Sequence, residues 1–260
     1  MATIHIEQRV KNLMRMVAQQ GASDLHLVVG RYPTLRIDGK LFPLTEEKVL
    51  TPDETQEMAD VIMGDEHAKK FLEDKQVDLS YNFENKARFR VNVFFQQGYV
   101  SVAMRLISNE IRRLEELNMP EMLYDLIKFN QGLVLVVGPV GHGKSTTLAA
   151  LINEINQTQE KHIVTIEDPI EYVYQQDKSI VNQREVHQDA KSFETALKSV
   201  LREDANVVLV GELRDLESIS IAMTAAETGH LIFATLHTND SAQTVDRIID
   251  VFPSHQQNQV

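Results

Sequence analysis

Residues 138–145 combine glycines, a lysine and a serine in an order that can hold a phosphate group. They read Gly-Pro-Val-Gly-His-Gly-Lys-Ser and match the pattern G-x-x-x-x-G-K-S/T completely. Glycines let backbone N–H groups turn inward around an anion, Lys144 can place its charge on β- and γ-phosphate oxygens, and Ser145 can offer its hydroxyl to Mg²⁺. The pattern predicts an ATP and Mg²⁺ site whose phosphate-contacting residues are Gly138, Gly141, His142, Gly143, Lys144, Ser145 and Thr146.

The flanking residues predict the elements that such a loop requires. Residues 133–137 are all apolar, as in a buried parallel strand, and residues 146–152 predict a helix whose N-terminus faces the phosphate. A glycine-rich turn without a ligand would leave the Lys-Ser pair at the start of this helix unexplained. Strands and helices alternate downstream, which predicts an α/β domain with a parallel sheet and helices on both faces.

Acidic residues follow the next predicted strand, residues 163–166. This strand leads directly into Glu167, Asp168 and Glu171. In open α/β sheets, ligands bind at the carboxyl ends of strands, so these carboxylates are candidates to order Mg²⁺-bound waters. The alternative is a solvated acidic loop, and the neighbouring phosphate loop favours the metal-supporting interpretation.

A further apolar strand, residues 207–210, ends in Gly211 and Glu212. Many phosphate-loop ATPases have a Mg²⁺-binding Asp in the first of these positions and then a Glu that polarises water. Here the glycine leaves Glu212 as the candidate general base, and it leaves the metal to Ser145 and waters. An acidic residue that only stabilises a helix N-terminus is the alternative.

Two histidines, His230 and His237, bracket another apolar strand. A rise of roughly 3.3 Å per residue puts their imidazoles at opposite ends of this strand, so a shared metal site is not expected. His237 stands at the carboxyl end, which favours a role as a sensor of the γ-phosphate. A core or capping histidine is the alternative.

The first hundred residues predict a separate α+β module with an antiparallel sheet. Apolar residues at helical spacing predict a helix over residues 4–20, and Thr51 followed by Pro and two acids predicts the start of a second helix. Strands are predicted at residues 25–29, 35–37, 41–42, 77–83, 88–95 and 99–107. The predicted bounds are 1–110 for this module, 111–120 for a polar linker and 121–260 for the phosphate-loop domain, with a helix over 121–129.

Arginines in this module could stabilise charge on the γ-phosphate in the transition state. The candidates are Arg88, Arg90 and Arg105. The same residues fit solvated positions on the sheet equally well.

The composition argues against several classes of protein. A formal net charge of −12 is unfavourable for broad binding to nucleic acid. No apolar run approaches the length of a membrane span, and the first residues lack the layout of a signal peptide, so no membrane insertion is expected. The chain has no cysteine, which excludes disulfides and thiolate zinc sites and fits a cytoplasmic location.

Together these segments resemble the secretion and type IV pilus ATPases, and most closely the PilT-type retraction motors. The resemblance covers nearly the whole chain. It rests on residues 22–27, 88–94, 138–145, 167–171, 211–215, 228–239 and 247–253, which occur in this order.

The resemblance implies a PAS-like N-terminal domain, a RecA-like ATPase domain, and a homo-hexameric ring with ATP between the domains. It implies a motor for pilus retraction and twitching motility that works on the pilus machinery through a platform protein, at the cytoplasmic face of the inner membrane. It also implies roles for individual residues: Lys144 and Ser145 bind phosphate and Mg²⁺, Glu212 is the catalytic glutamate, Glu167 and, through water, Asp168 support the metal, Arg90 and Arg105 reach the phosphates, and His230 and His237 are sensors.

Extension motors of this family generally carry an extra N-terminal domain and a four-cysteine zinc module, so the features of this chain favour retraction. His142 stands where the family usually has a small residue, and Asn239-Asp240-Ser241 differs from the common Asn-Ser-Ala. The chain ends shortly after a last predicted helix beginning near Asp240, which predicts a C-terminally truncated ATPase domain. The alternatives are an extension or secretion ATPase of the same family, a RecA-like nucleic-acid translocase, and a ring subunit that binds ATP without useful hydrolysis.

Overall fold

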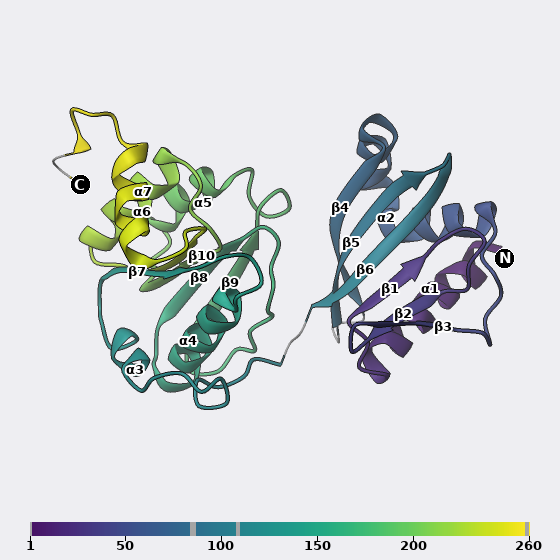
Figure 1. Cartoon of the computed structure of the whole chain (residues 1–260), viewed down its shortest axis with the longest axis horizontal. Helices are drawn as coiled ribbons and strands as arrows, with labels where there is room; N and C mark the ends of the chain where they lie inside the picture. The colour runs from purple at the N-terminus through teal and green to yellow at the C-terminus, as the bar shows by residue number, and fades with distance from the viewer. Residues whose placement is uncertain (1, 84–86, 108–109, 258–259) are drawn as a thin grey trace. The chain divides into compact units, whose positions relative to one another are not determined.

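The computed structural model describes residues 2–83, 87–107, 110–257 and 260. The chain divides into two compact units, Met1–Ser108 and Asn109–Val260, which are described separately below (Figure 1). The segment 111–120, predicted as a linker, is part of the second unit. Its Leu114 is only 1% exposed and packs with Ile127 and Leu148 in the core of that unit.

The first unit is a six-stranded antiparallel sheet with two helices on one face, as its sequence pattern predicts (Figure 1). The sheet order is β3-β2-β1-β6-β5-β4. Its elements are α1 (Ala2–Gln19), β1 (Asp24–Leu27), β2 (Thr34–Ile37), β3 (Lys40–Pro43), α2 (Pro52–Asp74), β4 (Gln76–Phe83), β5 (Ala87–Gln96) and β6 (Tyr99–Ile107).

Local chemistry accounts for both helices. The apolar residues of α1 that recur at helical spacing, such as Val10, Leu13 and Val17, are all buried against the sheet. At the start of α2, the Thr51 hydroxyl accepts a hydrogen bond from the backbone of Glu54 at 3.2 Å, and the Glu54 carboxylate accepts one from the backbone of Thr51 at 3.0 Å. This reciprocal capping box confirms the predicted helix start.

The second unit is a five-stranded parallel sheet in the order β7-β11-β10-β8-β9, which confirms the predicted α/β class. Its elements are α3 (Leu123–Leu126), β7 (Gly132–Val137), α4 (Lys144–Thr158), β8 (His162–Glu167), β9 (Ile180–Glu185), α5 (Phe193–Val200), β10 (Val207–Val210), α6 (Leu216–Glu227), β11 (Leu231–Leu236) and α7 (Ser241–Val251).

Two differences from the sequence-based prediction concern the surface of this unit. The helix predicted over 121–129 is only the four-residue α3, which has no buried side chain to stabilise a longer helix. Strand β9 escaped prediction because it lies at the sheet edge, where Ile180 and Asn182 are exposed and the apolar pattern is weak.

Alternate side chains of the central strands pack on opposite faces of the sheet. Ile163 and Phe233 lie in a core that includes Leu151 of α4. The core on the other face contains Val164 and Leu197, the latter from α5, together with residues of α6. The sheet therefore has helices on both faces, as the sequence predicted (Figure 1).

The last helix, α7, begins at a capping residue. The Asp240 carboxylate accepts a hydrogen bond from the backbone of Gln243 at 2.8 Å, which confirms the predicted helix start. Across the described ranges, no helix has the length and apolar content needed to cross a membrane.

Candidate active site

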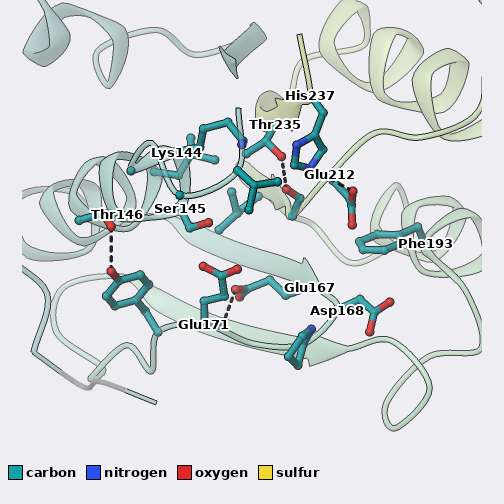
Figure 2. A pocket seen from close by; sticks show the side chains of 18 of the residues that line it. Lys144, Ser145, Thr146, Glu167, Asp168, Glu171, Phe193, Glu212, Thr235 and His237 are labelled. Atoms are coloured by element: carbon teal, nitrogen blue, oxygen red, sulfur yellow. Dashed lines mark hydrogen bonds and ion pairs between the residues drawn. The ribbon is translucent and has the colours of Figure 1, made fainter. Parts of the chain in front are cut away.

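The carboxyl ends of β8, β10 and β11 and the loop after β7 surround a cavity of about 410 Å³ in the second unit (Figure 2). Ends of parallel strands meet at one edge of the sheet, which is where such folds bind ligands. The sequence-predicted residues that line this cavity are Gly141, Gly143, Lys144, Ser145, Thr146, Glu167, Asp168, Glu171, Glu212 and His237. Segments up to about a hundred residues apart in the chain are thus brought to one place.

The loop at 138–145 has the backbone that its glycines predict. Gly138, Gly141 and Gly143 have φ angles of 147°, 80° and 81°, a region that residues with side chains rarely adopt. Lys144 is buried, and its ammonium donates hydrogen bonds to the carbonyl oxygens of Gly138 at 2.9 Å and Pro139 at 3.0 Å. Because α4 begins at Lys144, its N-terminal N–H groups are directed to the cavity, as anion binding requires.

His142 is the one unusual residue of this loop. Its side chain is exposed, and its Nδ1 atom lies 3.1 Å from the carbonyl oxygen of Val140. It does not line the cavity, unlike its neighbours Gly141 and Gly143.

Glu167, the last residue of β8, is a buried carboxylate. Its Oε1 accepts a hydrogen bond from the Thr165 hydroxyl at 2.7 Å, and its Oε2 accepts one from the backbone N–H of Glu171 at 3.2 Å (Figure 2). Burial raises the pKa of Glu167 to about 7, although these hydrogen bonds favour the ionised form. The carboxylate therefore titrates near neutral pH.

Only two of the three acidic residues face the same place. The carboxylates of Glu167 and Glu171 lie together on the side of the cavity where Ser145 is found, whereas the exposed Asp168 points away from them (Figure 2). The sequence grouped Asp168 with the metal-supporting acids. The structure separates Asp168 from Glu167 because β8 ends at Glu167 and the chain bends at Asp168, where the loop after the strand begins.

Gly211 packs directly against the end of β8. Its N–H donates to the carbonyl oxygen of Ile166 at 2.8 Å, and a Cβ added at this position would lie 3.4 Å from the Cα of Glu167. The position that carries a Mg²⁺-binding Asp in many phosphate-loop ATPases is thus in close contact with Glu167. The buried carboxylate at this point of the site comes from β8 instead of β10.

The oxygen atoms around the loop fit Mg²⁺. They belong to the Ser145 hydroxyl and to the carboxylates of Glu167 and Glu171, and hard oxygen donors are the ligands that Mg²⁺ prefers. Within the described residues, no group of three or more acidic or histidine side chains could hold a metal by itself. Mg²⁺ commonly keeps several waters and takes phosphate oxygens as ligands, so this donor set suits an ion that arrives with a nucleotide.

Glu212 and His237 lie next to each other at the ends of β10 and β11. His237 Nε2 is 3.6 Å from Glu212 Oε2 (Figure 2). The guanidinium of Arg214 also pairs with the Glu212 carboxylate. This pairing raises the pKa of Arg214, mainly through the hydrogen bond to Glu212. The Glu212 side chain is 15% exposed and remains accessible from the cavity.

His230 lies outside the cavity. It precedes β11, and its Nδ1 atom is 3.1 Å from the carbonyl oxygen of Ala225 in α6. The sequence assigned sensor roles to both His230 and His237. The structure brings only His237 to the cavity, because the six residues of β11 separate the two imidazoles.

Arg90 and Arg105 belong to the first unit, where they lie opposite each other on the neighbouring strands β5 and β6. Arg105 Nε donates to Oδ1 of the buried Asp24 at 2.8 Å. Burial by itself would raise the pKa of Asp24, but hydrogen bonds from Ser23 and Arg105 lower it overall. Asp24 lies within the motif at 22–27, yet its strand neighbours could not be read from the sequence.

Residues on the loop after β8 and on β9 also belong to the site and were missed. Tyr172 and Tyr174 line the cavity, and the hydroxyl of Tyr172 is 3.0 Å from that of Thr146 (Figure 2). The side chain of Gln183 holds the main chain of both tyrosines. No local pattern identifies them, because their place depends on how this loop packs against α4.

Comparison with known proteins identifies the family of this chain. Over residues 2–256 the chain matches the family described as Type II/IV secretion system protein. It is 46% identical over 254 residues to the type IV pilus retraction ATPase PilT of Pseudomonas aeruginosa, which covers 96% of this chain and 73% of the relative. It is 45% identical over 255 residues to a twitching motility protein of Neisseria gonorrhoeae, covering 98% of this chain and 68% of the relative.

A solved structure shows the same likeness. The crystal structure of the pilus retraction motor PilT with bound ADP matches with a TM-score of 0.91 and 48% identity, over 96% of this chain and 73% of that one. The family match, these identities and the shared structure lead to one assignment. The chain belongs to the Type II/IV secretion system protein family, as a PilT-type member.

Proposed function

We propose that this chain is a motor subunit that hydrolyses ATP to drive type IV pilus retraction and twitching motility. The observation that carries the proposal is that the phosphate loop and Glu212 line one cavity. The 46% identity of the chain to a pilus retraction ATPase supports retraction as the direction of movement.

The residues that line the cavity have separate roles in ATP hydrolysis. Lys144 and the N-terminus of α4 bind the phosphates, and Ser145 and Glu167 would hold the hydrated Mg²⁺. When bound, the ion neutralises charge on the β- and γ-phosphates. Glu212 accepts a proton from the attacking water, and His237 fixes the position of its carboxylate.

The resemblance implies a wider assembly, which we include in the proposal. The first unit would be a PAS-like domain and the second a RecA-like ATPase domain, arranged in a homo-hexameric ring at the inner face of the cell membrane. Arg90 and Arg105 remain candidates to supply positive charge for hydrolysis. A platform protein of the pilus machinery would receive the movement.

The decisive biochemical experiment compares ATP hydrolysis by the wild type and by Glu212→Gln, with ADP binding measured on both. The proposal expects hydrolysis in the wild type, its loss in the variant, and binding in both. An unchanged hydrolysis rate in Glu212→Gln would contradict the proposed motor mechanism. Strong stimulation by DNA or RNA would instead indicate a nucleic-acid translocase.

Deletion of the gene in its host tests the biological direction. If the protein is a retraction motor, cells without the gene should carry surplus pili and should not twitch, because pili are extended but not retracted. Cells without pili would indicate an extension motor of the same family.

A further inference from the structure

Gln183, on strand β9, braces the loop that joins β8 to β9. Its Nε2 donates a hydrogen bond to the carbonyl oxygen of Tyr172 at 2.7 Å and lies 3.5 Å from Oε1 of Glu167, and its Oε1 accepts one from the backbone N–H of Tyr174 at 2.9 Å. A single half-buried amide thus fixes the main chain on both sides of residue 173. Two hydrogen bonds from one side chain restrict the main chain of a loop that is not part of a β-sheet.

The loop held by Gln183 places the phenol of Tyr172 next to α4, the helix that follows the phosphate loop. The Tyr172 hydroxyl lies 3.0 Å from Oγ1 of Thr146, in the first turn of α4 and next to Ser145 (Figure 2). Both residues line the cavity. The contacts therefore form a chain from Gln183 through Tyr172 to Thr146.

The direction of these hydrogen bonds follows from the ligand. An ionised phosphate oxygen can only accept hydrogen bonds, so a threonine that binds it must donate its hydroxyl proton to it. Thr146 then needs a donor for its own oxygen, and the Tyr172 hydroxyl is in place to supply one. A phenol held at this distance turns the Thr146 proton towards the phosphate before the ligand arrives.

We propose that Gln183 is a positioning residue of the nucleotide site, which holds Tyr172 so that Thr146 is oriented to donate to a nucleotide phosphate. In this proposal Gln183 acts through Tyr172 and not through its longer contact with Glu167, and the double variant described below separates the two routes. The inference rests on nucleotide binding in the proposed function and adds to it a residue outside all the motifs on which the resemblance depends.

Gln176 provides a matched control in the same loop. Its Nε2 donates to the carbonyl oxygen of Val181 at 2.6 Å, and its Oε1 accepts from the N–H of Val181 at 2.9 Å. Gln176 therefore makes the same kind of two-point brace between the loop and β9. It holds Val181, which does not line the cavity, whereas Gln183 holds Tyr172 and Tyr174, which do, so Gln176 controls for the structural effect of losing such a brace.

The test measures the dissociation constant for ADP with Mg²⁺ by calorimetry, and the melting temperature, for the wild type and four variants. The variants are Gln183→Leu, Gln176→Leu, Tyr172→Phe and the double variant Gln183→Leu/Tyr172→Phe. We expect both glutamine variants to melt at lower temperature. Of these two, only Gln183→Leu should also weaken ADP binding, by about tenfold.

The double variant tests whether Gln183 acts through Tyr172. If it does, Tyr172→Phe weakens binding by itself, and adding it to Gln183→Leu produces little further loss. Equal weakening by Gln176→Leu, or additive effects in the double variant, would overturn the proposal.

The outcomes separate this inference from the proposed function. A wild type that binds no ADP contradicts the function itself, whereas normal binding by a folded Gln183→Leu protein contradicts only the inference. Tyr172→Phe keeps the main-chain brace and removes one hydroxyl. Its normal affinity would overturn the proposal even where Gln183→Leu fails to fold.

Discussion

His237 Nε2 lies 3.6 Å from Oε2 of Glu212, although 24 residues separate the two along the chain. The contact exists because β10 and β11 are parallel neighbours, so both side chains emerge at the same edge of the sheet. It connects the candidate general base with the residue predicted to sense the γ-phosphate. Two motifs that look independent in the sequence are thus parts of one site.

Replacing Glu212 by Gln should abolish steady-state hydrolysis and leave nucleotide binding intact. The amide keeps the shape of the side chain but cannot accept a proton at neutral pH, and a general base contributes typically 10²- to 10⁴-fold. Single-turnover and steady-state rates at saturating ATP measure this loss. A reduction of less than about tenfold would assign the base to another residue.

Replacing His237 by Ala should lower kcat more than it changes ADP affinity. The imidazole lies 3.6 Å from the Glu212 carboxylate, so its removal loosens the catalytic carboxylate. One lost polar contact predicts a reduction of kcat by about tenfold. Equal changes in kcat and in ADP affinity would show that His237 belongs to the binding part of the site.

Introducing the usual metal-binding residue, as Gly211→Asp, should destabilise the second unit without increasing activity. The new Cβ would lie 3.4 Å from the Cα of Glu167, so the added carboxylate stands beside an acid that is already buried. Overpacking and like charge predict a loss of about 1–3 kcal/mol. Urea unfolding measures it, and Gly211→Ala serves as the control because that Cβ alone makes an ordinary contact. A stable and more active Asp variant would contradict this account of the glycine.

Glu167 should make stability depend on pH. Its folded pKa of about 7 lies above the ordinary value of 4.5, so between these values the folded protein holds a proton that the unfolded chain releases. The stabilisation is present at low pH and is lost as pH rises through the folded pKa, with a slope of up to about 1.4 kcal/mol per pH unit.

Unfolding of the wild type and Glu167→Gln between pH 5 and 8 measures this contribution. The variant cannot ionise, so its stability relative to the wild type should improve as pH rises. Parallel profiles for the two proteins would show that Glu167 does not titrate in this range.

The sequence by itself determined the parts of this protein that depend on local backbone chemistry. The glycines at 138, 141 and 143 permit the turn of the phosphate loop, and apolar runs identify the strands whose ends carry Glu167, Glu212 and His237. The helix starts at Thr51 and Asp240 follow in the same way from capping side chains. Each of these predictions uses residues only a few positions apart.

Only the tertiary structure decided which of these parts meet. The strand order β7-β11-β10-β8-β9 sets Gly211 against Glu167 and Glu212 beside His237, and it leaves His230 at the far end of β11. Packing of the loop after β8 turns Asp168 away and brings Tyr172 to Thr146. Strand pairing and loop packing depend on the burial of side chains from the whole unit, and short-range spacing does not record which distant segments bury one another.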